Sequence, residues 1–163
     1  MTAAFPETPF AAPTRIDLEP VPLAVVRHDG IRLDALQAAF DEGYAAIAGL
    51  FADGVLTPVG PAIAVYYGDP MGEFDLELGF PVATAPRDPV AAAGVPVLGS
   101  ALPGGPAVAA SHFGAYDTLG RGWAQLVQSV DGEPTGVWIE SYVSDPTEPA
   151  ESLRTDLILP VRG

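Results

Sequence analysis

The sequence contains no cysteine and no lysine, and its only histidines are His28 and His112. Without thiols the chain cannot form disulfides, use a thiolate nucleophile or build a cysteine-based metal site. Two histidines are too few for a zinc site with several histidine ligands, and a P-loop needs a lysine beside its glycines. Carboxylate sites stay possible, but we predict no bound metal and no cofactor.

Positive charge is scarce, because 7 arginines face 21 acidic residues and the net charge is −14. Such a surface repels phosphate backbones and anionic lipids, so we predict neither a nucleic-acid nor a membrane partner. It would attract cations to a cleft, although the same acidity can simply keep an apolar chain soluble. No secretory signal and no membrane-spanning run is found, so we expect a soluble, cytoplasmic protein.

The first half of the chain has a strand–helix–strand–strand pattern. Residues 1–15 contain three prolines and no period, which predicts a flexible lead. A strand is expected over 16–28, with internal prolines that suit a sheet edge. Apolar residues then recur every three or four positions, which predicts an amphipathic helix from an N-cap at Asp34 to a stop at Gly54. Two further strands are expected, over 62–67 and 74–80.

The second half repeats this order after a connector at 84–105, in which a short strand is expected over 95–98. The repeated elements are a strand, a helix capped by Asp117 and two more strands, the first of them closed by a turn at 144–146. Their expected ranges are 107–113, 117–131, 137–143 and 153–161.

Matching motifs indicate a duplication. Gly60 and Asp69-Pro70 recur 76 residues later as Gly136 and Asp145-Pro146. Several such matches in the same order are hard to attribute to chance. We predict an α+β domain over 16–163, with repeat one at 16–83 and repeat two at 106–163. The two strand–helix–strand–strand repeats would form a pseudo-twofold antiparallel sheet with helices on one side and a central ligand groove.

The segment 137–143 carries the main candidate site. In a strand alternate residues share a face, so Trp138, Glu140 and Tyr142 lie together. We expect these three to point away from the helices, and Val137, Ile139, Ser141 and Val143 to point toward them. A carboxylate between aromatic rings attracts lipophilic cations through charge and cation–π contacts. The alternative is a solvent-facing strand with an ordinary surface glutamate.

Further ligand-binding candidates are Tyr66, Tyr67, His112, Tyr116 and Tyr44. Tyr66 and Tyr67 end the strand that matches 137–143, and Tyr116 precedes the second helix. His112 beside a glycine turn can also be purely structural, and Tyr44 on a helix can be core.

Three other features are interpreted as structural. Trp123 and Phe40 lie on apolar helix faces and are expected in the core. Ser111 and His112 are adjacent and would point to opposite faces of a strand, which argues against a Ser–His couple. Asp75 and Glu77 share a strand face that could bind a hard cation, but a solvated face is the simpler interpretation.

Four segments, 60–67, 77–82, 112–119 and 140–146, give the chain a resemblance to the gyrase-inhibitor-like (GyrI-like) domain. This domain also forms the effector-binding half of some AraC-type and MerR-type regulators. The resemblance implies a central groove for lipophilic, often cationic, drugs and dyes, with the functional carboxylate at Glu140. In many relatives an aromatic residue directly precedes this glutamate, whereas here Ile139 does, and Trp138 is one place earlier. The resemblance covers 16–162, so we expect a stand-alone binder without a DNA-binding domain.

Three functions follow from this sequence. The first is broad-specificity binding of lipophilic, often cationic, aromatic small molecules. The second is hydrolysis of strained electrophilic molecules with Glu140 as general base, as the resemblance implies for some stand-alone relatives. The third is inhibition of a larger enzyme through protein binding, in which case the partner is unknown.

Overall fold

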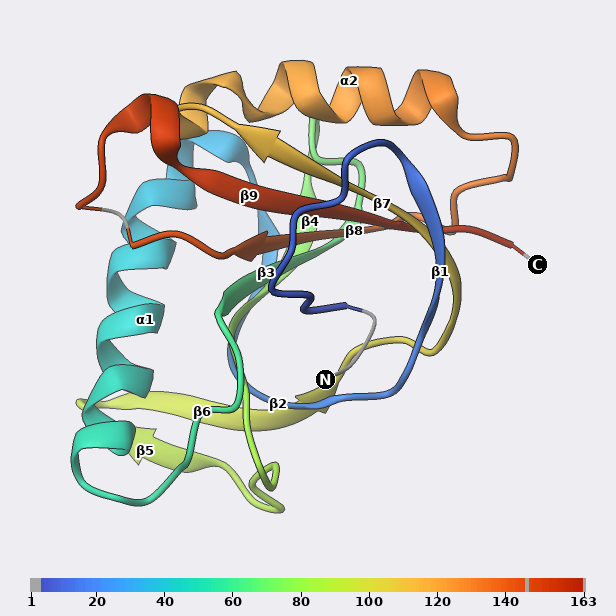
Figure 1. Ribbon diagram of the computed structural model, residues 1–163. Coiled ribbons are helices and arrows are strands. Elements are labelled where there is room, and N and C mark those ends of the chain that lie inside the picture. Colours follow the sequence, from blue (N-terminus) through green and yellow to red (C-terminus); the bar gives the residue numbers. More distant parts are fainter. Residues whose placement is uncertain (1–3, 146, 163) are drawn as a thin grey trace. The chain divides into compact units, whose positions relative to one another are not determined.

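The structure is a computed structural model that describes residues 4–145 and 147–162. The chain forms two compact units, Pro20–Leu102 (the first unit) and Met1–Glu19 with Pro103–Gly163 (the second unit). Each unit contains one antiparallel sheet and one main α-helix (Figure 1). Among the described residues no helix is both long and apolar enough to cross a membrane.

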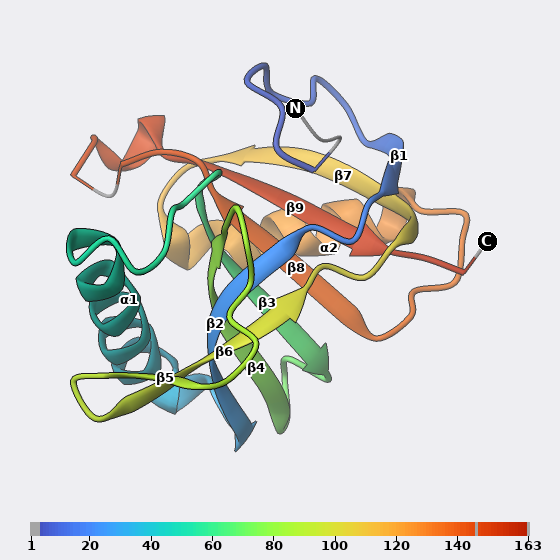
Figure 2. The ribbon, with the colours of Figure 1, turned by 90° about the horizontal axis from the view of Figure 1, so that it is seen from below.

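In the first unit a helix packs on one face of a five-stranded sheet. The strand order is β3-β4-β2-β6-β5, and the β5–β6 hairpin extends the sheet beyond β2 (Figure 2). Its elements are β2 (Pro22–Ile31), a 3-10 turn (Leu33–Ala35), α1 (Leu36–Ala52), β3 (Ala62–Gly68), β4 (Phe74–Pro81), β5 (Val90–Ala92) and β6 (Val95–Ala101).

Helix α1 places its buried residues three or four positions apart, at Ala39, Gly43, Ala46, Ile47 and Leu50. This spacing puts them on one stripe of the helix, which packs against Ala24, Val26, Val82 and Val97 of the sheet side. The apolar period of the sequence is therefore the cause of this helix and of its orientation.

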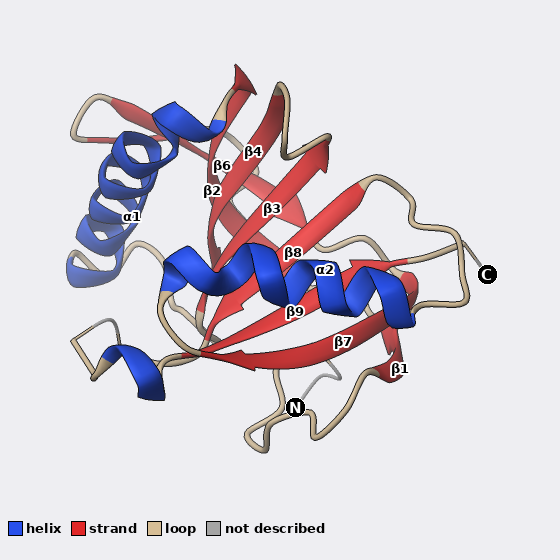
Figure 3. Cartoon of the chain, turned by 90° about the horizontal axis from the view of Figure 1, so that it is seen from above, coloured by secondary structure: helices blue, strands red, loops and turns tan. Residues whose placement is uncertain are grey.

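The second unit has the strand order β1-β7-β9-β8, and α2 lies across these strands (Figure 3). Its elements are β1 (Thr14–Leu18), β7 (Gly105–Phe113), the 3-10 turn η2 (Tyr116–Thr118), α2 (Leu119–Ser129), β8 (Val137–Tyr142), a 3-10 turn (Ala150–Ser152) and β9 (Arg154–Pro160). Leu119 and Leu126 of α2 join Leu157, Leu159 and Val161 in one buried cluster.

The predicted α+β class with two strand–helix–strand–strand copies is confirmed. Each copy is a strand, a helix and two strands, β2-α1-β3-β4 in the first unit and β7-α2-β8-β9 in the second. The connector holds β5 and β6, and the strand expected over 95–98 lies within β6. The groove expected between the copies stays a prediction.

The single strand predicted over 16–28 is wrong. The ladder breaks around Pro20, and β1 pairs with β7 whereas β2 pairs with β4 and β6. Proline cannot donate a ladder hydrogen bond, which explains a break at this position. The predicted lead also carries defined contacts from Pro6 onward, because Arg154 donates to the carbonyl oxygens of Pro6 and Glu7.

The predicted helix caps are partly wrong. Asp34 and Asp117 lie inside 3-10 turns, and the helices begin at Leu36 and Leu119 without a side-chain cap bond. The predicted stop at Gly54 is confirmed, since α1 ends at Ala52 and Gly54 has a φ of 75°, which suits glycine after a helix. In the predicted turn at 144–146, Pro146 lies outside the described residues.

Candidate functional site

Glu140 is a buried carboxylate on β8, with 6% of its surface exposed. The indole Nε1 of Trp123, on α2, donates to its Oε2 at 2.8 Å. The hydroxyl of Tyr142 donates to its Oε1 at 2.5 Å. These two donors are neutral groups, so they bond to the carboxylate without adding a charge of their own.

Each of the two donors of this carboxylate contacts a further aromatic ring. Trp138 and Trp123 meet edge to face, with ring centroids 5.3 Å apart and an interplanar angle of 82°. Tyr116 and Tyr142 do the same at 5.8 Å and 78°. The second unit thus brings together an acidic group and four rings, and we call Glu140, Trp123, Trp138, Tyr142 and Tyr116 the Glu140 centre.

The predicted alternation is confirmed, but the predicted direction is wrong. Trp138 and Tyr142 pack against the α2 cluster, and Glu140 bonds to Trp123 of that helix. These side chains therefore point toward the helix of their unit. Ile139 and Ser141 are also fully buried, with 0% exposed, so β8 is covered on both faces. A strand buried on both faces gives no sequence signal for the side on which its helix lies.

Trp123 is a side chain of the candidate site that the sequence interpretation missed. It was expected in the core, and its ring does pack against the α2 cluster. The N–H of a half-buried indole nonetheless tends to find an acceptor, and Glu140 provides it. This tendency of tryptophan to pair its N–H was the available signal.

His112 and Tyr116 are linked through η2. His112 Nε2 lies 2.8 Å from Thr118 Oγ1, and Tyr116 is 41% exposed. Burial, and secondarily the positive charge of Arg121, hold the pKa of His112 below its ordinary value of 6.5. Burial and the charge of Asp145 raise the pKa of Tyr116. Of these two candidates, Tyr116 joins the Glu140 centre, whereas the described bond of His112 leads to Thr118.

The three tyrosine candidates of the first unit have separate environments. Tyr44 donates to the carbonyl oxygen of Ile63 at 2.6 Å, so its ring also has a structural role on α1. Tyr66 is 6% exposed and its ring lies 5.4 Å from that of Phe74. Tyr67 is on the opposite face of β3 and donates to Glu77 Oε1 at 3.2 Å. Whether these tyrosines act together with Glu140 stays a prediction.

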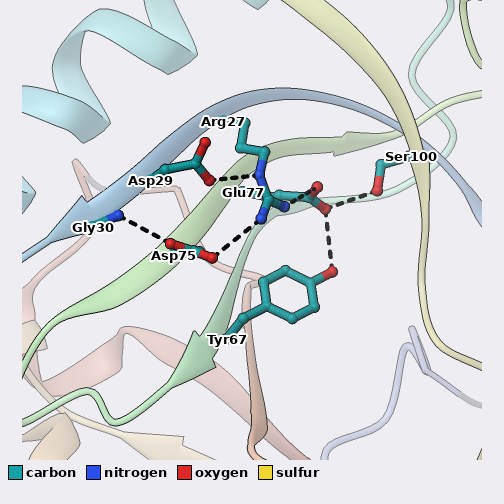
Figure 4. Close-up of polar contacts among 7 residues, drawn as sticks. All are labelled: Arg27, Asp29, Gly30, Tyr67, Asp75, Glu77 and Ser100. Atoms are coloured by element: carbon teal, nitrogen blue, oxygen red, sulfur yellow. Dashed lines mark hydrogen bonds and ion pairs between the residues drawn. The ribbon is translucent and has the colours of Figure 1, made fainter.

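A polar network on the first unit, drawn in Figure 4, surrounds Arg27. The guanidinium bonds to Asp29 at 2.8 Å, to Glu77 at 3.0 Å and to Asp75 at 3.3 Å. Ser100 Oγ donates to Glu77 Oε1 at 2.7 Å. Arg27 and Glu77 are direct cross-strand partners on β2 and β4, which explains why they meet.

The expectation of a solvated face is therefore wrong for Glu77, which is 7% exposed. Arg27, Tyr67 and Ser100 provide the partners that a buried carboxylate needs. The side chain of Asp75 is 43% exposed, as expected. Among the described residues no group of three or more acidic or histidine side chains is arranged to hold a metal ion.

Comparison with known proteins shows which solved structures have a similar fold. No family model matches the chain, and no curated protein matches it in sequence. The C-terminal domain of EcmrR superposes with a TM-score of 0.73 at 17% identity, over 93% of this chain and 97% of that one. A hydrolase from Listeria innocua gives 0.64 at 17% identity, over 96% and 94%.

A third structure, SAV2435 bound to tetraphenylphosphonium, gives a TM-score of 0.62 at 14% identity, over 93% of this chain and 94% of that one. At these identities the comparisons establish the fold. The chain therefore has the fold of the EcmrR C-terminal domain, which is consistent with the GyrI-like resemblance of its sequence.

Proposed function

We propose that the chain binds lipophilic, cationic aromatic small molecules at the Glu140 centre. The observation that carries this proposal is a carboxylate that is 6% exposed and to which two neutral groups, Trp123 and Tyr142, donate hydrogen bonds. A cation that reaches this carboxylate gains Coulomb attraction in a medium of lower dielectric than water. An uncharged molecule of the same shape gains none.

The rings of the centre supply the remaining affinity. Each aromatic face that a cation approaches contributes about 0.5–2 kcal/mol. Burial of the ligand's apolar surface adds about 25 cal/mol per Å². Rings tolerate many ligand shapes, so we expect broad specificity with a preference for positive charge. The fold shared with SAV2435, which was solved with the lipophilic cation tetraphenylphosphonium, supports this choice of ligand class.

A pair of ions of the same shape tests the proposal. Tetraphenylphosphonium and tetraphenylborate share four phenyl groups but carry opposite charges. Calorimetry on the wild type should show binding of the cation and at least about tenfold weaker binding of the anion, equivalent to about 1.4 kcal/mol. Glu140→Gln should remove most of this difference.

The control separates the site from the charge of the whole protein. Asp131→Asn removes one negative charge at an exposed position, so it should leave the preference for the cation unchanged. Equal binding of both ions, or equal effects of the two variants, would refute the proposal.

Hydrolysis of strained electrophiles with Glu140 as general base is the second candidate for the same carboxylate. Trp123 and Tyr142 donate to the two carboxylate oxygens that a general base would use to bind the attacking water. Mass analysis of an epoxide substrate after long incubation distinguishes the two functions. Turnover that Glu140→Gln abolishes would assign hydrolysis, whereas intact ligand supports binding alone.

A further inference from the structure

The second unit contains a cavity of about 270 Å³ that the Glu140 centre does not use. It lies between the segment before β1, the end of β7 and helix α2. Its lining is apolar on the side of Phe10 and Leu126, and its polar side chains are Ser111, His112 and Gln125. Among the described residues that line it, none is charged, although the chain as a whole carries −14.

His112 presents a hydrogen-bond acceptor at this cavity. The hydroxyl of Thr118 donates its one proton to the carbonyl oxygen of Ala115 at 2.6 Å. Thr118 Oγ1 therefore accepts from His112 Nε2, which lies 2.8 Å away. A neutral imidazole carries a single N–H, so this network assigns the proton to Nε2 and leaves a lone pair on Nδ1.

The imidazole of His112 packs closely against Gly122 of α2. A Cβ on Gly122 would lie 2.7 Å from His112 Nδ1, closer than such contacts allow. Because Gly122 has no side chain, the imidazole of His112 can approach α2 closely. No described residue donates to Nδ1, and both His112 and Gly122 line the cavity.

We propose that this cavity binds small uncharged aromatic molecules whose N–H or O–H group donates to His112 Nδ1. Pockets for drug-sized ligands measure about 300–1,000 Å³, so the observed volume suits a molecule of one or two fused rings. The apolar lining favours an aromatic body, and the absence of a charged lining side chain favours a neutral one. The burial that lowers the pKa of His112 keeps its imidazole neutral near pH 7.

Indole and 1-methylindole test this proposal, because they differ in shape by one methyl group and only indole has a donor. Titration of ¹⁵N-labelled protein, followed by NMR, should show indole-induced shifts at residues 10–13 and along α2. Binding of 1-methylindole should be about tenfold weaker, the usual effect of a lost hydrogen bond. No shifts with indole, or equal affinity for both compounds, would overturn the proposal.

Variants assign the acceptor. His112→Phe keeps a ring but removes the lone pair, so it should bind both compounds equally. His112→Asn can present its amide oxygen near the position of Nδ1 and should retain the preference for indole. If His112→Phe does not fold, Gly122→Ala is the alternative variant. It crowds Nδ1 and should therefore weaken indole binding. A preference for indole that survives in both His112→Phe and Gly122→Ala would overturn the proposal.

The proposal for the Glu140 centre and the proposal for this cavity can be refuted independently. Glu140→Gln lies outside the cavity lining and should leave the indole titration unchanged. Loss of indole binding in Glu140→Gln would instead show that the compound occupies the Glu140 centre, and it would refute the separate site.

Discussion

Trp123 on α2 and Glu140 on β8 are joined by a hydrogen bond of 2.8 Å between the indole nitrogen and the carboxylate. This bond connects the helix of the second unit to β8, the strand that carries the candidate ligand-binding carboxylate. Tyr142 donates to the other carboxylate oxygen at 2.5 Å, so the two bonds together orient the carboxylate. Both carboxylate oxygens are held by these bonds, which would lower the entropy lost in the proposed binding.

Trp123→Phe removes the indole donor and leaves a buried carboxylate oxygen without this bond. We expect the free energy of unfolding to fall by about 1–3 kcal/mol, as for other buried polar groups that lose a partner. Urea denaturation measures this change. In the Glu140→Gln background the same substitution should cost less, since the charged acceptor is gone. Equal costs in both backgrounds would show that the bond contributes little.

Tyr67 should ionise at a higher pH than a free tyrosine. Burial, and then the negative charge of Glu77, raise its pKa from 10.0 to about 12. The folded state therefore holds this proton more tightly than the unfolded state, so stability falls as pH rises from 10 to 12. Ultraviolet difference titration should show a late tyrosine step that Tyr67→Phe removes and Glu77→Gln moves to lower pH. A late step unchanged in both variants would contradict this assignment.

His112 should remain neutral to a lower pH than a free histidine. Burial lowers its pKa below 6.5, and Arg121 on α2 contributes in the same direction. The unfolded state then binds the proton more readily, so stability decreases as pH falls through 6.5 toward the folded pKa. NMR titration of the imidazole should give a pKa that Arg121→Gln raises. The exposed control Arg87→Gln, in the first unit, should leave it unchanged.

Arg154 and Asp156 form a buried ion pair at 2.7 Å, with side-chain exposures of 7% and 1%. Arg154→Met would leave Asp156 unpaired and release the carbonyl oxygens of Pro6 and Glu7. We expect a loss of about 3–5 kcal/mol in unfolding free energy and faster proteolysis of the segment before β1. The double variant Arg154→Met, Asp156→Leu should be less destabilised, because no charge stays buried without its partner. A double variant as unstable as the single one would contradict this explanation.

The sequence was sufficient for the strand–helix–strand–strand order of the two copies, although it did not separate β1 from β2. Apolar spacing in 36–52 and strict alternation in 74–80 are local properties, and the structure has α1 and β4 there. Alternation also grouped Trp138, Glu140 and Tyr142 correctly on one face.

The packing between distant segments could not be predicted from the sequence by such local patterns. Nothing local shows on which side of β8 the helix lies, because Ile139 and Ser141 are as buried as Glu140. The pairing of β1 with β7 joins Thr14 to Ala109, and no short-range pattern encodes such a pair. The partner of Trp123 was missed for the same reason, since it depends on how α2 is placed across the sheet.

The most direct test of the Glu140 centre is a crystal structure of the protein with tetraphenylphosphonium. We predict that the ion lies against Trp138 and Tyr142, with its phosphorus within about 6 Å of an aromatic ring and on the side of the Glu140 carboxylate. An ion bound elsewhere, with Glu140 still enclosed by Trp123 and Tyr142 and out of its reach, would contradict the proposed function.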